Sequence, residues 1–486
     1  MSFTSLEFYI FLPTVLIIYQ FLPSRYRYIH LLISSYLFYA CNNVRLLLLI
    51  VLTTLVTYLC AITMEKVKTK AGNKMAVLCA LTVCLGILWI FKYLNFSLNL
   101  VSSLSGLFGF PVSFRNFSII LPMGISFYVF QTMSYTLDVY HGKMKAERHL
   151  GYYALFVVFF PQLVAGPIER PEDLLPQLKK ACPIQKNNLL EGFCYFIRGY
   201  AKKILIADYV AGFVDTAYQN IAAAGGSALF AATVLFAIQI YCDFSGYSDI
   251  ALGCARFLGI RLTENFKNPY AAISIRDFWH RWHRSLTRWF TDYVYIPLGG
   301  SRQGLLRHCR NIFLTFLVSG LWHGANLTFL CWGGIHGLYL MIETLWNHRK
   351  WHPTFGSNRT TKKFVVPLQR ISTFFLVCFA WIFFRSPSLT DALFIIGQII
   401  CNPCLNQLLP ALGLTPSKLV LLCLILLTLP VVENLPSMIL AHDEEQAFPK
   451  QSLRMCLYFL LILCIFLCRF MILTERGSTN FIYFQF

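Results

Sequence analysis

Long apolar runs recur along this sequence, and they restrict its fold more than any other feature. A run of about 20 apolar residues crosses a hydrocarbon layer roughly 30 Å thick as a helix. None of the runs has the residue alternation of a membrane β-strand. Because helices satisfy their own backbone in lipid, the sequence predicts an all-α polytopic membrane protein with about 10 to 13 helical segments. The apolar runs lie near residues 6–23, 28–40, 44–64, 76–98, 117–140, 150–165, 189–222, 228–258, 311–346, 364–385, 389–412, 418–438 and 452–473.

The charged residues support a membrane chain with basic cytoplasmic loops. Only 13% of residues are charged and 57% are hydrophobic, whereas a soluble protein averages about 25% charged residues. A net charge of +19 would suggest nucleic-acid binding in a soluble protein, but cytoplasmic loops of membrane proteins also accumulate Lys and Arg. Residues 65–74 hold four lysines against one acid, and Arg25 and Arg27 separate the first two runs. We expect both loops to face the cytoplasm, the N-terminus to lie outside, and no nucleic-acid partner.

Proline and glycine interrupt several of the apolar runs, at Leu121-Pro-Met-Gly124, Phe160-Pro161, Gly246, Gly320 and Gly324. Such interruptions within a membrane indicate broken or re-entrant helices that line a cavity. The first run begins near Leu6 without a basic leader or a cleavage site, so it is predicted to be a retained span.

Neither internal repeats nor a soluble domain is evident, and we expect one membrane domain over residues 1–486. Most of the 17 cysteines lie in apolar runs, where a thiol behaves as a small hydrophobe. Cys401-Asn-Pro-Cys404 has no second pair, so no metal site is expected. The expected sections are N-terminal spans in 1–140, a loop-rich section with basic residues in 141–310, a histidine-bearing helix in 311–346, and C-terminal spans with an aromatic tail in 347–486.

Positive charge concentrates between Arg256 and Arg310, where ten Lys and Arg stand against three acids. One interpretation is a cytoplasmic loop that pairs with anionic lipid headgroups. The other is a basic mouth that receives a polyanionic small molecule, such as a nucleotide carrier with phosphates.

The segment from Arg276 to Phe290 predicts a helix with two distinct faces. His283 falls on the aromatic face, where it either packs as a buried histidine or transfers a proton. The polar stripe comprises Asp277, Arg281, Arg284 and Arg288, and the aromatic stripe comprises Trp279, His283, Leu286 and Phe290.

His323 is the strongest candidate for chemistry. It occurs deep in an apolar run, between Gly320 and Gly324. An ionisable side chain at such depth is costly, which favours a functional role over a structural one. A neutral imidazole there is suited to act as a general base. Asn326, about one turn further on, is expected to orient the ring.

Three acids also lie in apolar runs: Asp138, Asp243 and Asp249. We expect them to fix broken helices through charge-assisted hydrogen bonds, with Arg256 or Arg276 as partners.

The sequence has no Walker loop, GxSxG elbow, HExxH or dinucleotide fingerprint, which removes the usual support for ATP-driven transport, serine hydrolysis, zinc proteolysis and NAD chemistry.

Several motifs together resemble the membrane-bound O-acyltransferase superfamily. They are Phe278-Trp-His-Arg-Trp-His-Arg-Ser-Leu-Thr-Arg-Trp-Phe290, Asp292-Tyr-Val-Tyr-Ile-Pro-Leu-Gly-Gly300 and Gly320-Leu-Trp-His-Gly324. The resemblance extends over nearly the whole chain, and within the superfamily it is greatest to the membrane subunits of bacterial alginate and peptidoglycan O-acetyltransferases. It implies helices around a central funnel or tunnel, with His323 as the catalytic histidine and His283 as the second histidine.

The resemblance also implies a reaction. His323 would activate the acyl acceptor, and the basic mouth would dock the phosphates of acetyl-CoA on the cytoplasmic side, with no metal required. The acetyl group would pass across the inner membrane of a bacterium to a polysaccharide, through an extracytoplasmic serine-hydrolase-like O-acetyltransferase as partner. Expected substrate-binding residues are Trp279, Trp282, Arg281, Arg284, Trp322, Asn326 and Asp249.

The C-terminal residues Phe481-Ile-Tyr-Phe-Gln-Phe486 resemble a terminal motif of surface-polysaccharide acyltransferases. The resemblance implies that Tyr483 carries the acyl group; an aromatic anchor at the membrane interface is the alternative. Two other functions stay open at this point: D-alanyl transfer to a teichoic-acid-like polymer, and a transporter that uses the same helices with His323 as a proton relay.

Overall fold

The computed structural model describes residues 1–348 and 359–440, apart from positions 42, 68, 111, 165 and 181. Over these ranges the chain consists of helices and loops without a strand, which confirms the all-α prediction. Tyr483 and the rest of the aromatic tail lie outside the described residues. The funnel or tunnel stays a prediction.

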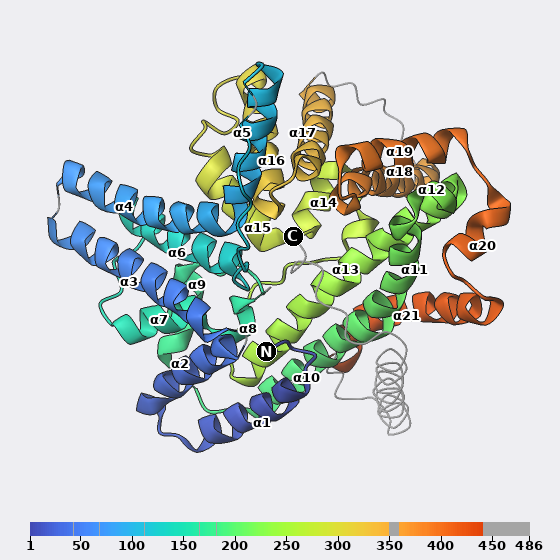
Figure 1. The fold of residues 1–486 in the computed structure, drawn as a ribbon. Coiled ribbons are helices and arrows are strands. Elements are labelled where there is room, and N and C mark those ends of the chain that lie inside the picture. Colours follow the sequence, from blue (N-terminus) through green and yellow to red (C-terminus); the bar gives the residue numbers. More distant parts are fainter. Residues whose placement is uncertain are drawn as a thin grey trace, which may run out of the picture. The chain divides into compact units, whose positions relative to one another are not determined.

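The chain forms two compact units (Figure 1). The first comprises Met1–Phe193 and Ile250–Thr263, and the second comprises Cys194–Asp249 and the described chain from Glu264 onward. Helices α10 (Lys186–Tyr200) and α13 (Gly226–Phe257) begin in one unit and end in the other. The first unit also contains α1 (Leu6–Phe21), α2 (Ser24–Ala40), α3 (Val44–Val67), α4 (Lys70–Leu88), α5 (Leu94–Leu107), α6 (Ile125–Tyr140), α7 (Leu150–Val158), α8 (Phe160–Leu163) and α9 (Pro171–Lys180).

The second unit carries the predicted site residues that the structure describes. Its helices are α11 (Asp208–Gln219), α12 (Ile221–Ala224), α14 (Ile275–Arg281), α15 (Arg284–Phe290), α16 (Leu305–His323), α17 (Leu327–His348), α18 (Arg359–Arg385), α19 (Leu389–Cys401), α20 (Leu408–Ala411) and α21 (Pro416–Leu440). A π-helical turn, Ala201–Ala207, joins α10 to α11.

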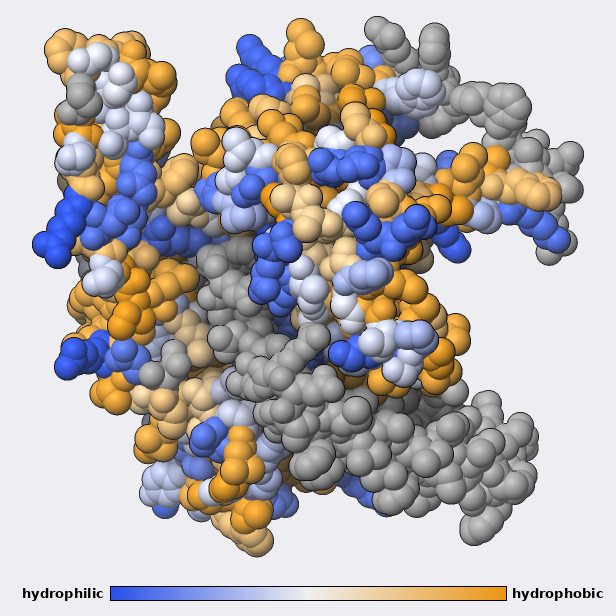
Figure 2. All heavy atoms as spheres, turned by 45° about the vertical axis from the view of Figure 1, so that its right-hand side comes forward, coloured by the Kyte–Doolittle hydropathy of each residue, from blue (hydrophilic) through white to orange (hydrophobic). Residues whose placement is uncertain are grey.

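Five of the described helices are long and apolar enough to cross a membrane, which agrees with the predicted polytopic membrane protein. Apolar side chains cover much of the surface seen in Figure 2, which agrees with apolar helices that cross a bilayer. The five candidate spans are Val44–Val67, Lys70–Leu107, Gly226–Phe257, Lys363–Arg385 and Pro416–Asn434.

Helix α3 illustrates how polar residues are accommodated in such a span. The hydroxyls of Thr53, Thr54 and Thr57 donate to backbone carbonyls four residues earlier in the helix. Thr57 also shares a hydrogen bond of 2.7 Å with the buried Tyr153 of α7. The threonines are therefore buried and satisfied, while leucines such as Leu48 and Leu59 are exposed.

The histidine-bearing helix predicted over 311–346 is two antiparallel helices, α16 and α17, which lie side by side (Figure 1). The interruption predicted at Gly324 is confirmed, whereas Gly320 lies within α16. The break follows His323, where Gly324 adopts an extended backbone conformation. Gly320 and Gly333 allow the two backbones to approach closely: a Cβ atom on Gly333 would overlap the carbonyl oxygen of Phe316. His323 thus ends a helix instead of lying in the middle of one.

We expect Gly333→Ala to destabilise the protein by about 1–3 kcal/mol, because the methyl group collides with the backbone of α16. Gly334→Ala is the matched control: its Cβ would come no closer than 3.7 Å to a neighbour, and alanine favours a helix by up to about 1 kcal/mol over glycine. Thermal unfolding in detergent measures both. Equal stability of the two variants would contradict the close packing of α16 and α17.

Candidate active site

His323 lies at the C-terminal end of α16, inside a cluster of aromatic rings. Its side chain is almost fully buried, with 4% of its surface exposed. The imidazole centroid is 4.9 Å from the ring of Trp322, 4.9 Å from that of Trp332 on α17, and 5.4 Å from that of Phe384 on α18. Three helices therefore hold the predicted catalytic histidine in an apolar environment with little access to bulk water.

His283 is brought close to this cluster, but not through a helical face as predicted. It lies in the break between α14 and α15 and has a left-handed backbone, with φ 42°. Its ring packs edge-on against Phe244 of α13 at 4.7 Å and against Trp322 at 6.1 Å. Trp322 thus contacts both candidate histidines.

The continuous helix predicted over Arg276–Phe290, with its two stripes, is therefore wrong. Of the predicted polar stripe, the ion pair between Asp277 and Arg281 forms, because both residues lie within α14; Arg281 Nε is 2.7 Å from Asp277 Oδ1. The reason is a neighbouring segment that pairs with the break. The backbone N–H of Arg284 donates to the carbonyl of Asn265, and the Asn265 side chain accepts from the Ser285 hydroxyl at 2.7 Å.

The other predicted tryptophans occupy the same aromatic cluster. Trp282 is buried and stacks with Phe278 at 5.4 Å, and its ring lies 5.2 Å from Trp381 on α18. Trp279 packs against Trp332 at 5.8 Å. Its indole N–H donates to Nδ1 of His336 on α17, at 3.2 Å. Sequence reasoning missed His336, although it is also an ionisable residue in an apolar run.

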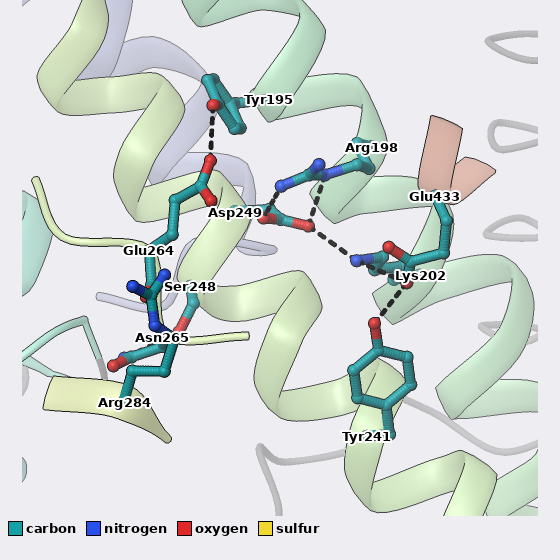
Figure 3. Close-up of polar contacts among 10 residues, drawn as sticks. All are labelled: Tyr195, Arg198, Lys202, Tyr241, Ser248, Asp249, Glu264, Asn265, Arg284 and Glu433. Carbon is teal, nitrogen blue, oxygen red and sulfur yellow. Dashed lines mark hydrogen bonds and ion pairs between the residues drawn. The ribbon is translucent and has the colours of Figure 1, made fainter. Parts of the chain in front are cut away.

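Asp249 belongs to a separate buried charge cluster on the same unit, shown in Figure 3. Its carboxylate pairs with Arg198 and, at 3.0 Å, with Lys202. Lys202 also pairs with Glu433 of α21 at 2.8 Å, and the Tyr241 hydroxyl donates to the same Glu433 oxygen. The adjacent Lys203 pairs with Asp208 at 2.8 Å and with Asp243.

The predicted arginine partners of the three acids are therefore wrong. Arg256 pairs with Glu191, and Arg276 lies 3.6 Å from Glu343. Asp138 pairs with Lys143 at 3.3 Å. The acids find lysines and Arg198 instead, because the π-helical turn between α10 and α11 brings Lys202 and Lys203 next to α13.

Three further predicted residues make contacts away from His323. Asn326 does not orient the imidazole: its amide nitrogen donates to the Pro387 carbonyl, and its oxygen accepts from the Thr328 N–H at the start of α17. Arg281 is half-buried against Asp277, and Arg284 is exposed, 3.5 Å from the Glu264 carbonyl. Arg284 therefore lies at the surface and not in the aromatic cluster.

Residues 147–385, which include both histidines, match the sequence profile of the membrane-bound O-acyltransferase family. The chain is 40% identical over 392 residues to the probable alginate O-acetylase of Pseudomonas putida. The aligned region covers 80% of this chain and 78% of that protein. The chain belongs to the membrane-bound O-acyltransferase family.

Two other relatives add to this comparison. The peptidoglycan O-acetyltransferase of Helicobacter pylori is 34% identical over 400 residues, covering 76% of this chain and 73% of that protein. The teichoic acid D-alanyltransferase of Bacillus subtilis is 28% identical over 283 residues, covering 54% of this chain and 68% of that protein. As a membrane-bound O-acyltransferase, this chain is a multi-pass membrane enzyme that transfers an acyl group to oxygen.

Burial lowers the pKa of His283 in this O-acyltransferase to about 3, and His283 lies outside the candidate spans. The unfolded imidazole takes up its proton near pH 6.5, so the unfolded state holds more protons between these values. Stability should therefore fall as the pH drops below 6.5. Between pH 6.5 and 5 we expect the wild type to lose about 2 kcal/mol more than His283→Gln, as measured by unfolding in detergent. A difference that does not change with pH would contradict a neutral buried His283.

Proposed function

We propose that this chain takes an acetyl group from acetyl-CoA on the cytoplasmic side of a bacterial inner membrane and passes it across for O-acetylation of an extracytoplasmic polysaccharide. The observation that carries the proposal is His323, buried among three aromatic rings in a chain whose relatives include alginate and peptidoglycan O-acetyltransferases. The lower identity and shorter match to the D-alanyltransferase favour acetyl transfer over D-alanyl transfer.

The chemistry requires one base and a site with little water. His323 accepts the proton of the acceptor hydroxyl while that oxygen attacks the carbonyl carbon of the thioester. The C–O bond forms, the C–S bond breaks, and the thiolate of coenzyme A leaves and takes up a proton. Exclusion of bulk water by Trp322, Trp332 and Phe384 protects the thioester from hydrolysis.

The coenzyme A phosphates would bind to the basic surface of the same unit. Arg284 and Arg288 on α15 and Arg302 and Arg307 beyond it are exposed. Guanidinium groups suit phosphate because they form paired, charge-assisted hydrogen bonds. Trp322 and Trp282 would contact the acyl end, where the aromatic cluster is continuous with His323.

Delivery to the polymer involves two further proposals. Tyr483, outside the described residues, would hold the acetyl group as an ester after transfer from coenzyme A. A serine-hydrolase-like O-acetyltransferase outside the membrane would take the group from Tyr483 and pass it to the polysaccharide.

Radiolabelled acetyl-CoA and the purified protein test this sequence of steps. We expect the wild type to retain label and to gain the mass of one acetyl group, and we expect neither His323→Ala nor Tyr483→Phe to do so. Donor hydrolysis that depends on His323 without covalent label would make Tyr483 an anchor. If the wild type neither retains label nor hydrolyses acetyl-CoA, the donor is wrong and D-alanyl transfer becomes the better proposal.

A further inference from the structure

Three buried N–H groups in the aromatic cluster have no hydrogen-bond acceptor among the described residues. They belong to Trp332 on α17, Trp381 on α18 and His336 on α17, and each side chain is fully buried. A buried donor is almost always paired, because its desolvation otherwise costs stability. Three of them in one cluster therefore call for a ligand that brings its own acceptor.

The protonation of His336 follows from its neighbour. An indole nitrogen is a donor only, so the Trp279 N–H must donate to an unprotonated Nδ1 of His336, at 3.2 Å. The proton of the neutral imidazole then lies on Nε2, the atom without a described partner. Trp279 is thus a positioning residue, which sets the tautomer of His336.

Trp332 lies at the centre of this group, because its ring contacts His336, Trp381 and the candidate base His323. Trp332 lies 4.9 Å from His323, 5.1 Å from His336, and 6.0 Å from Trp381, with which it is stacked (centroid distances). Phe384 contacts Trp332, Trp381 and His323 and completes the apolar surround. The donors therefore belong to the same packed cluster as the imidazole that would remove the proton.

The chemistry of the donors selects the ligand atom. Indole and neutral imidazole N–H groups carry no formal charge, whereas a phosphate or carboxylate is usually held by Arg or Lys. Neutral donors in an apolar site suit an uncharged carbonyl oxygen that becomes negative only during the reaction.

We propose that the N–H groups of Trp332, Trp381 and His336 bind the carbonyl oxygen of the acyl group and stabilise the negative charge that develops on it during transfer. The inference rests on the proposed function. As the acceptor oxygen attacks, the electron pair of the C=O bond moves onto the carbonyl oxygen; it returns when the C–S bond breaks. His323 accepts the proton of the acceptor hydroxyl, and the three N–H groups donate hydrogen bonds to the oxyanion.

Variants that remove one donor each test this assignment through steady-state kinetics with acetyl-CoA. Trp332→Phe and Trp381→Phe keep an aromatic ring but lose the N–H. His336→Asn keeps an acceptor for Trp279 and loses the donor at the Nε2 position, while His336→Gln places an amide N–H near that position. We expect kcat to fall about 10²-fold in the first three, with KM nearly unchanged, and to recover partly in His336→Gln.

The control is Trp89→Phe in the first unit, whose indole N–H donates to the Ser97 hydroxyl at 3.2 Å. Its kcat should match that of the wild type. If Trp332→Phe, Trp381→Phe and His336→Asn all keep the kcat of this control, the donors serve packing or a structural water and the inference is overturned. Absence of any acetyl-CoA turnover by the wild type would overturn the proposed function and this inference with it.

Discussion

Replacing His323 with alanine should abolish acyl transfer while the protein stays folded. A general base contributes about 10²–10⁴-fold to a rate, and His323 is the imidazole that α16, α17 and α18 bury together. We expect acetyl transfer to fall by at least about two orders of magnitude. The measurement is acetyl transfer from labelled acetyl-CoA by protein that elutes as a single peak and has the unfolding temperature of the wild type.

His348→Ala is the matched control, since His348 is an exposed histidine at the end of α17. It should keep full activity. A well-folded His323→Ala protein that still transfers acetyl groups would rule out His323 as the base. The assignment would then pass to His283 or His336, the other buried histidines of the aromatic cluster.

The second large effect concerns stability. Lys202→Met should destabilise the protein by about 3–5 kcal/mol, because it leaves the Glu433 carboxylate without its cation and the buried Asp249 with Arg198 alone. The Lys202 ammonium lies 3.0 Å from Asp249 and 2.8 Å from Glu433, and its side chain is 2% exposed. Thermal or denaturant unfolding in detergent measures the loss.

Arg148→Met provides the comparison for this charge cluster. Arg148 is 85% exposed and lies 3.5 Å from Glu65, so its ion pair contributes at most about 1 kcal/mol. Adding Glu433→Gln to Lys202→Met should recover part of the stability, because it removes the carboxylate charge that Lys202 had paired. Equal stability of Lys202→Met and Arg148→Met would show that the cluster contributes little to folding.

The sequence was sufficient for the fold class, and it singled out His323 as the candidate base. Apolar runs predict membrane helices because the lipid leaves the backbone few alternatives. His323 stands out because an ionisable group in such a run needs a reason to be there. Both arguments use only local sequence, and both agree with the burial and the family match that were found.

The neighbours of His323 could not be predicted in the same way. Trp332, Phe384 and Trp381 come from α17 and α18, and only tertiary packing brings them to the end of α16. His336 and Lys202 were within reach of the rule that identified His323, since each is ionisable and lies in an apolar run. Their partners, Trp279 and Glu433, lie 57 and 231 positions away in the chain.

The two breaks, after His323 and at His283, have separate physical causes. At Gly324 the chain leaves α16, and Asn326 then caps the start of α17 through the Thr328 N–H, a signal that local sequence does contain. At His283 the spacing was compatible with a helix, but the backbone of Asn265 pairs with the break. The break at His283 depends on Asn265, 18 residues earlier in the chain, so the spacing of polar and apolar residues within 276–290 does not predict it.

The π-helical turn at Ala201–Ala207 makes the length of this segment as important as its composition. Each helical residue turns the chain by about 100°. A chain with one residue fewer here would rotate all that follows against α10. Asp208 would swing away from Lys203, and Lys203 could not keep both of its acids, although every charged residue was still present. A deletion at this point would therefore rotate the helix that follows about its axis. Relatives that differ in length here should also differ in which acidic residues pair with their lysines.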